Sequence, residues 1–160
     1  ATLASAGKVF QLLDTEQVVK DTPDAVKLPP VTGEVVFDHV GFAYAERPPV
    51  LHAIDFAVQA GERIAIVGPT GAGKSALIHL IPRFYDPDAG CVRLDGRNLR
   101  EWRLEDVRRQ VGLVFQESFL FSASVAANIA FGKPDATREQ IAKADIVALG
   151  HGGLLGKVGR

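Results

Sequence analysis

The 160-residue sequence has no methionine, a single cysteine, and no apolar run of the roughly 18 residues that a bilayer-spanning helix needs. The lone Cys91 excludes an internal disulfide and fits a reducing compartment. A formal net charge of −1 gives no indication of nucleic-acid binding or of attraction to an anionic membrane. The N-terminus lacks the basic and apolar segments of a signal peptide, and the absence of methionine hints at a fragment. The histidines lack metal-ligand spacing, so we assign them no chemistry.

Residues 68–75 read Gly-Pro-Thr-Gly-Ala-Gly-Lys-Ser and match the phosphate-binding pattern G-x-x-x-x-G-K-[ST] at every position. The glycines permit backbone angles that a side chain would block, so that successive N–H groups can point at an anion. Lys74 places a positive charge near the outer phosphates, and the Ser75 hydroxyl is a ligand for Mg²⁺. We therefore predict that a nucleoside triphosphate binds to Gly68, Pro69, Thr70, Gly71, Ala72, Gly73, Lys74 and Ser75.

The segments on either side of this loop strengthen the prediction. Residues 63–67 form a short apolar run typical of a buried strand, and residues 72–81 contain good helix formers and are followed by Pro82. A phosphate loop requires this order of strand, glycine-rich loop and helix. The N-terminus of the helix adds a partial positive charge behind the phosphates.

The rest of the chain divides into short elements. Residues 93–109 are rich in arginine but also in carboxylates, which indicates a solvated surface of mixed charge rather than a nucleic-acid site. The pattern predicts, in order, a helix over 1–13, a Pro-containing linker over 14–32, strands at 34–40, 42–44 and 54–58, a hairpin turning at Asp95-Gly96, a helix over 103–110, a buried strand over 111–115, a helix over 125–131 capped by Ser124, and a helix opened by a capping box at 137–140.

Several segments together resemble the ATPase domain of ATP-binding cassette (ABC) exporters, in which membrane and ATPase domains share one polypeptide. The matching residues are 33–35, 41–44, 61–75, 83–87, 94–96, 114–117 and 128–132, in the order and spacing of that family. The resemblance implies a P-loop α/β core with an antiparallel β subdomain, and it covers most of 33–145. The segment 5–30 resembles the link from the last membrane helix, and 146–160 is unassigned.

The resemblance also implies roles for individual residues. Tyr44 would stack on adenine, and its place at a strand end before a Pro-rich loop favours this role over that of a strand-edge tyrosine in the core. Gln116 would reach Mg²⁺ and the attacking water, and Lys74 would be the second catalytic residue. Ala76 stands where the family usually has Thr, so one hydroxyl contact to the α-phosphate is expected to be lost.

Two catalytic motifs of the family are absent after Gln116. There is no apolar strand ending in Asp and Glu, and no Leu-Ser-Gly-Gly-Gln signature; residues 113–117 and 149–153 match these motifs only in part. We expect the chain to be the carboxyl-terminally truncated ATP- and Mg²⁺-binding part of an exporter. The complete protein would pair with a second ATPase domain and a transmembrane domain at the cytoplasmic face of a membrane, without nucleic acid. A soluble ABC-type ATPase and an ATP-binding module without catalysis are the alternatives.

Overall fold

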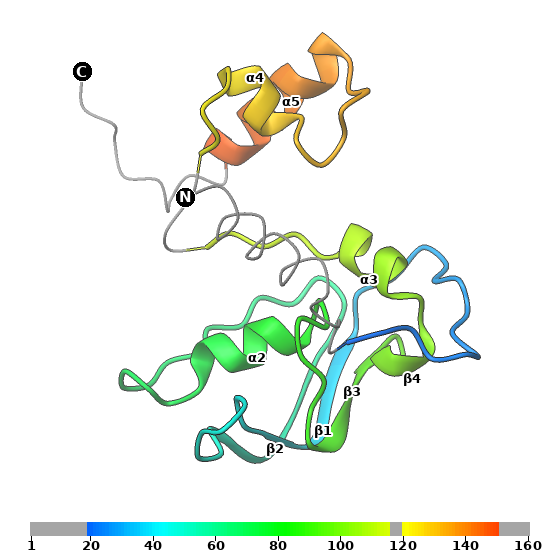
Figure 1. The fold of residues 1–160 in the computed structure, drawn as a ribbon, viewed down its shortest axis with the longest axis vertical. Coiled ribbons are helices and arrows are strands. Elements are labelled where there is room, and N and C mark those ends of the chain that lie inside the picture. Colours follow the sequence, from blue (N-terminus) through cyan, green and yellow to red (C-terminus); the bar gives the residue numbers. More distant parts are fainter. Residues whose placement is uncertain (1–18, 116–119, 151–160) are drawn as a thin grey trace, which may run out of the picture. The chain divides into compact units, whose positions relative to one another are not determined.

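The computed structural model describes residues 19–115 and 120–150, and the chain divides into two compact units between Leu113 and Val114 (Figure 1). The predicted helix over 1–13 and the predicted catalytic Gln116 lie outside the described residues.

The first unit is built on an antiparallel sheet. Its strands are β1 (Val35–Phe42), β2 (Leu51–Val58), β3 (Ala89–Leu94) and the short β4 (Arg97–Asn98). They lie side by side in the order β2-β1-β3-β4, so that β1 is central and pairs with β2 on one edge and β3 on the other. The antiparallel β subdomain predicted from the sequence is therefore confirmed.

The β3–β4 hairpin turns at the dipeptide that the sequence singles out. Asp95 (φ 50°) and Gly96 (φ 78°) both have left-handed backbone angles, as a two-residue type I′ turn requires. The Asp95 carboxylate accepts hydrogen bonds from the backbone N–H groups of Thr32, Gly33 and Glu34 at 2.7, 3.0 and 2.9 Å. Burial opposes ionisation of this carboxyl, but these hydrogen bonds outweigh it and lower the pKa of Asp95.

Helix α2 (Lys74–Leu80) and helix α3 (Leu104–Gln110) contribute buried side chains to the same core as the sheet, together with the short 3₁₀ segment η1 (Leu99–Glu101). Helix α2 occupies most of the predicted range 72–81 and ends before Pro82. The core consists of Leu28, Phe37, Val40, Phe42, Leu51, Ala76, Leu77, Leu80, Val92, Leu94, Leu99, Trp102 and Val107.

The strands predicted over 63–67 and 111–115 are wrong for this structure, because neither segment joins a ladder. Their apolar side chains are partly open to solvent, and Val67 is 88% exposed. The backbone of a parallel strand is satisfied only by a neighbouring strand, and an apolar run does not specify that neighbour. The described part of the chain thus forms the antiparallel subdomain and helices of the expected fold but not its parallel strands.

The second unit contains helix α4 (Val125–Ile129) and helix α5 (Arg138–Gly150). Both predicted caps are confirmed: Ser124 Oγ accepts from the N–H of Ala127 at 3.2 Å, while Thr137 and Gln140 exchange reciprocal hydrogen bonds of 3.0 and 3.3 Å. Helix α5 continues through the first part of the unassigned segment 146–160.

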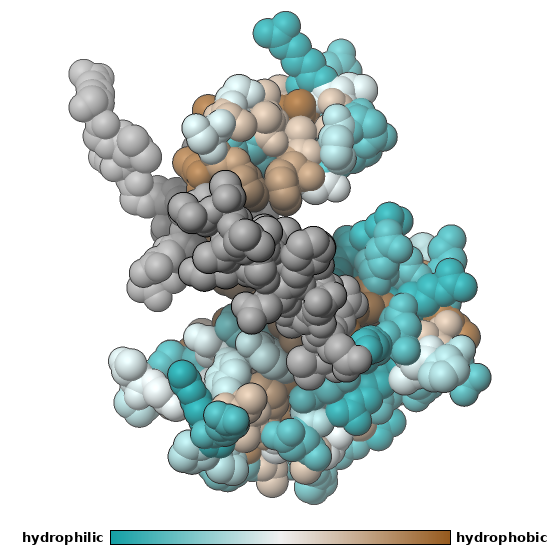
Figure 2. Space-filling model, in the orientation of Figure 1, coloured by the Kyte–Doolittle hydropathy of each residue, from teal (hydrophilic) through white to brown (hydrophobic). Residues whose placement is uncertain are grey.

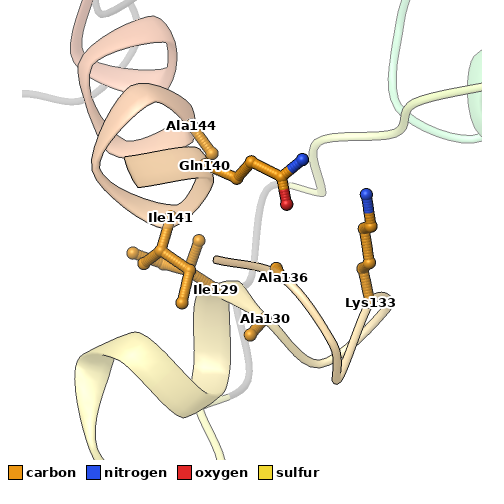
Figure 3. Close-up of a pocket in the computed structure, with 7 residues that line it drawn as sticks. All are labelled: Ile129, Ala130, Lys133, Ala136, Gln140, Ile141 and Ala144. Atoms are coloured by element: carbon orange, nitrogen blue, oxygen red, sulfur yellow. The ribbon is translucent and has the colours of Figure 1, made fainter. Parts of the chain in front are cut away.

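Apolar side chains on the second unit are widely exposed, and Figure 2 shows brown apolar surface on it. The rings of Phe121 and Phe131 stack at 4.5 Å. A pocket of about 320 Å³ lies between α4 and α5, bordered by Ile129 on α4 and Ile141 on α5 (Figure 3). None of the predicted phosphate-loop residues lines this pocket. Within 19–115 and 120–150, no helix combines the length and apolar character needed to cross a bilayer.

Candidate nucleotide-binding site

The phosphate loop owes its shape to two left-handed glycines. Gly71 and Gly73 both have φ 84°, and Gly73 occupies the N-cap of α2 without offering a side-chain oxygen to the first turn. The N–H groups at the start of α2 are thereby left for an anion. Gly68 does not use a left-handed angle as the sequence suggested, and a Cβ there would meet only Ala72 Cβ at 3.4 Å.

Gly73 is also required by a close approach of the chain. A Cβ at this position would lie 2.7 Å from the carbonyl oxygen of Val50 and 2.8 Å from Cδ2 of Leu51. The start of β2 therefore packs directly beneath the N-terminus of α2. This contact fixes the loop relative to the β subdomain, a relationship that the loop motif alone does not contain.

The Lys74 ammonium lies over the loop that precedes it. Its Nζ donates hydrogen bonds of 2.8 Å to the carbonyl oxygens of both Gly68 and Pro69. The turn is closed by a hydrogen bond from the N–H of Ala72 to the same Pro69 carbonyl at 3.2 Å. Ser75 follows on the exposed side of α2. The lysine charge and the serine hydroxyl are thus presented at one exposed loop.

Ala76 lies on the opposite side of α2 from this surface. It is 1% exposed and belongs to the core, together with Leu77 and Leu80. These three side chains anchor the helix that carries the phosphate loop. A threonine at position 76 would have to place its extra atoms in that core, where small-to-large changes commonly cost about 1–3 kcal/mol.

Tyr44 follows β1 and lies in an aromatic cluster. Its ring meets Phe42 edge-on at 4.9 Å and Tyr85 edge-on at 5.2 Å between centroids. Its hydroxyl lies 3.4 Å from Nδ1 of His79 on α2. Burial, and to a smaller extent Tyr85, raises the pKa of Tyr44, so the phenol is neutral at physiological pH. The cluster joins the end of β1 to the helix that follows the phosphate loop.

The segment after α2 is held by a buried arginine. Arg83 is 2% exposed and has φ 52°, and its guanidinium donates to the Asp86 carboxylate at 3.0 and 3.1 Å. Arg108 on α3 donates to the carbonyl oxygens of Pro82 and Arg83 at 3.2 and 2.9 Å. These bonds hold in place the turn that presents Tyr85 to Tyr44. Sequence reasoning had noted this segment only as part of the family resemblance.

A second polar cluster was missed by sequence reasoning. His39 Nδ1 lies 2.9 Å from Asp38 Oδ1 and 3.1 Å from Asp55 Oδ1, and Arg93 donates to the other Asp38 oxygen at 2.8 Å. The β1–β2 register, with its bulge near His39, brings His39 to Asp55, and the β1–β3 pairing brings Arg93 to Asp38. The hydrogen bond to Asp38 and the charge of Asp55 raise the pKa of His39. His39 and Arg93 in turn lower the pKa of Asp38.

The glycine-rich loop lies within a region that matches a known protein family. A protein-family model described as "ABC transporter" matches residues 51–154, which include the phosphate loop and helices α2 to α5. The chain belongs to the ABC transporter family. The match extends past the end of α5, so part of the segment that the sequence left unassigned is included in the ABC domain.

The chain is similar to ABC exporters, both to curated relatives and to a solved structure. It is 42% identical over 94% of its length to a putative multidrug export ATP-binding/permease protein, YgaD, of Bacillus subtilis. It is 45% identical over 82% of its length to the beta-(1→2)glucan export protein NdvA of Nitrobacter winogradskyi. A solved bacterial Atm1-family ABC exporter with ATP bound matches 91% of the chain with a TM-score of 0.76 and 38% identity. This confirms the ABC ATPase fold.

The chain spans about a quarter of these relatives: 26% of YgaD, 22% of NdvA and 27% of the solved exporter chain. It corresponds to their ATP-binding portion, and ABC membership carries nucleotide binding with it. The described loop fits a nucleotide by its chemistry, because it combines a lysine ammonium, a serine hydroxyl and a helix N-terminus without a side-chain cap.

Proposed function

We propose that this chain binds MgATP through residues 68–75 and forms the nucleotide-binding part of an exporter ATPase. The observation that supports it most directly is the position of Lys74, whose ammonium is held at 2.8 Å by two carbonyl oxygens of the loop itself. Those carbonyls orient the lysine toward the loop, and the phosphate oxygens of ATP would compete for the same three donor hydrogens.

Each residue has a distinct task in this proposal. Lys74 and the N–H groups at the start of α2 hold the β- and γ-phosphates, and the Ser75 hydroxyl is a ligand for Mg²⁺. A bound Mg²⁺ would supply positive charge against the phosphoryl oxygens. Tyr44 stacks on adenine from its place beside α2, and Gln116 positions the attacking water. Ala76 lies behind the loop and supports α2 from the core.

For the complete protein we propose the exporter cycle. Two ATPase domains close around two ATP molecules, hydrolyse them and drive transport through a transmembrane domain of the same or a partner chain. The ATPase domains then lie at the cytoplasmic face of the membrane. The names of the similar exporters support this placement, since they combine ATP-binding and permease functions.

Titration with a fluorescent ATP analogue in the presence of Mg²⁺ tests the binding proposal. We expect Lys74→Ala to lose most of the affinity, because the only charged side chain of the loop is removed. Circular dichroism and the melting temperature establish that the variant is folded, and Lys133→Ala in the second unit provides a charge-matched control. Equal affinity of folded wild type and Lys74→Ala would overturn the proposal.

A further inference from the structure

Residues 20–34, here named the strap, precede β1 and include most of the segment 14–32 that composition assigns to a linker. They are attached to helix α3 by side chains more than 75 positions away in sequence. The Asp21 carboxylate accepts a hydrogen bond from the N–H of Leu104 at 2.7 Å, and the Asp106 carboxylate accepts one from the N–H of Leu28 at 3.2 Å. The strap caps the helix, and the helix in turn binds the strap.

The first of these bonds supplies a cap that α3 does not have locally. Arg103 occupies the N-cap position of α3 and makes no side-chain capping bond. Asp21, from a distant part of the chain, provides the capping hydrogen bond instead. Its negative charge is also favourable at a helix N-terminus. In Figure 1 the blue segment that contains the strap runs alongside α3.

Backbone hydrogen bonds extend the attachment. The N–H of Val26 donates to Glu101 at 2.9 Å, and the N–H of Arg103 donates to Val26 at 2.9 Å, so the strap pairs with the residues leading into α3. Leu28 is 5% exposed and belongs to the core that also contains Val107 of α3.

Two further contacts hold the ends of the strap. Its first residue, Lys20, accepts a hydrogen bond at its carbonyl oxygen from the buried Arg83 guanidinium at 3.3 Å. At its other end, Thr32 is bound by Asp95 through both the backbone N–H and the hydroxyl, each at 2.7 Å. The strap is therefore fixed along its length, whereas a flexible linker would have few such contacts.

We propose that the strap and α3 form a single rigid unit, so that displacement of the chain before Lys20 is carried to the segment that follows α3. That segment begins at Val111 and leads to Gln116 within a few residues. The consequence for nucleotide chemistry rests on the proposed role of Gln116, whereas the rigid unit itself rests only on the contacts described above. The strap then acts as a conformational connection between the preceding chain and the end of α3 at Val111.

Asp21→Ala tests the proposal, with Asp24→Ala as its matched control. Asp24 is exposed and has no hydrogen bond or ion pair assigned within the described residues. The Asp24→Ala substitution removes the same charge as Asp21→Ala. In the absence of nucleotide, the rate of amide hydrogen exchange is measured for the amides of α3 and for the Leu28 amide. We expect Asp21→Ala to speed exchange at both places by about 2- to 30-fold, the range that corresponds to loss of a helix cap. Asp24→Ala is expected to leave both unchanged.

The Leu28 amide distinguishes a single unit from a simple cap, because Leu28 is held by Asp106 rather than by Asp21. Faster exchange in α3 alone, or equal exchange in the two variants, would overturn the proposal. Asp106→Ala provides the reciprocal measurement and is expected to speed exchange in α3 as well as at Leu28. Since no nucleotide is present, failure here is separate from failure of MgATP binding, which the fluorescence titration measures.

Discussion

Gly73 and Val50 lie so close together that a Cβ on Gly73 would approach the Val50 carbonyl oxygen to 2.7 Å. Gly71 has the same φ of 84° but open space where its Cβ would be. The two glycines of one loop thus share the same φ but have different surroundings. The contact makes the phosphate loop depend on β2, which precedes it in sequence.

We expect Gly73→Ala to destabilise the fold and weaken MgATP binding more than Gly71→Ala does. Both alanines meet the cost of a left-handed angle, about 1–2 kcal/mol, but only Gly73→Ala also forces apart β2 and α2. Urea unfolding and nucleotide titration of both variants provide the measurement. Equal losses would mean that the loop shifts away from Val50 without cost.

Tyr44 is expected to contribute to both binding and stability. Stacking on a base is worth about 1–3 kcal/mol, so Tyr44→Ala should weaken ATP binding, while Tyr44→Phe keeps the ring and should bind nearly as wild type. Because the ring also packs against Phe42 and Tyr85, Tyr44→Ala should lower the melting temperature of the nucleotide-free chain. A lower melting temperature with unchanged affinity would assign Tyr44 to the core alone.

The raised pKa of His39 predicts a pH dependence of stability. The folded chain keeps the His39 proton to higher pH than the unfolded chain, whose pKa is near the ordinary value of 6.5. The stabilisation is complete below that value and is lost as pH rises through the folded pKa. We expect the melting temperature of wild type to fall, relative to His39→Gln, as the pH rises above about 6.5.

The imidazole of His52, exposed on the neighbouring strand β2, supplies the control for this experiment. His52→Gln removes a histidine without touching the contacts of His39 to Asp38 and Asp55. It should retain the pH dependence of wild type. If His52→Gln and His39→Gln follow the same pH profile, the ion pairs of His39 do not stabilise the folded state.

We expect this chain by itself to bind ATP without steady hydrolysis. The Asp-Glu strand end and the signature motif are absent from its sequence. Loss of groups that act together in catalysis typically lowers rates by orders of magnitude. A phosphate-release assay on the folded chain measures this. Steady turnover that Lys74→Ala abolishes would reveal a catalytic carboxylate within the 160 residues.

The sequence by itself determined the features made by contiguous residues. The helix after the glycine-rich loop, the Asp95-Gly96 turn, the Ser124 cap and the capping box at Thr137 are present as predicted. Each depends on backbone angles and hydrogen bonds within a few positions of the residue concerned. The residues of a short segment are therefore enough to stabilise it.

Only the tertiary structure decided how distant residues meet. Three contacts join residues that the sequence separates: Gly73 with Val50, Asp21 with the N–H of Leu104, and His39 with Asp55. The residue pattern over 63–67 likewise predicted a strand, but pairing did not follow. Such contacts depend on strand register and on how helices pack. A local pattern indicates which secondary structure a segment favours, but it does not specify which other segment will pair with it.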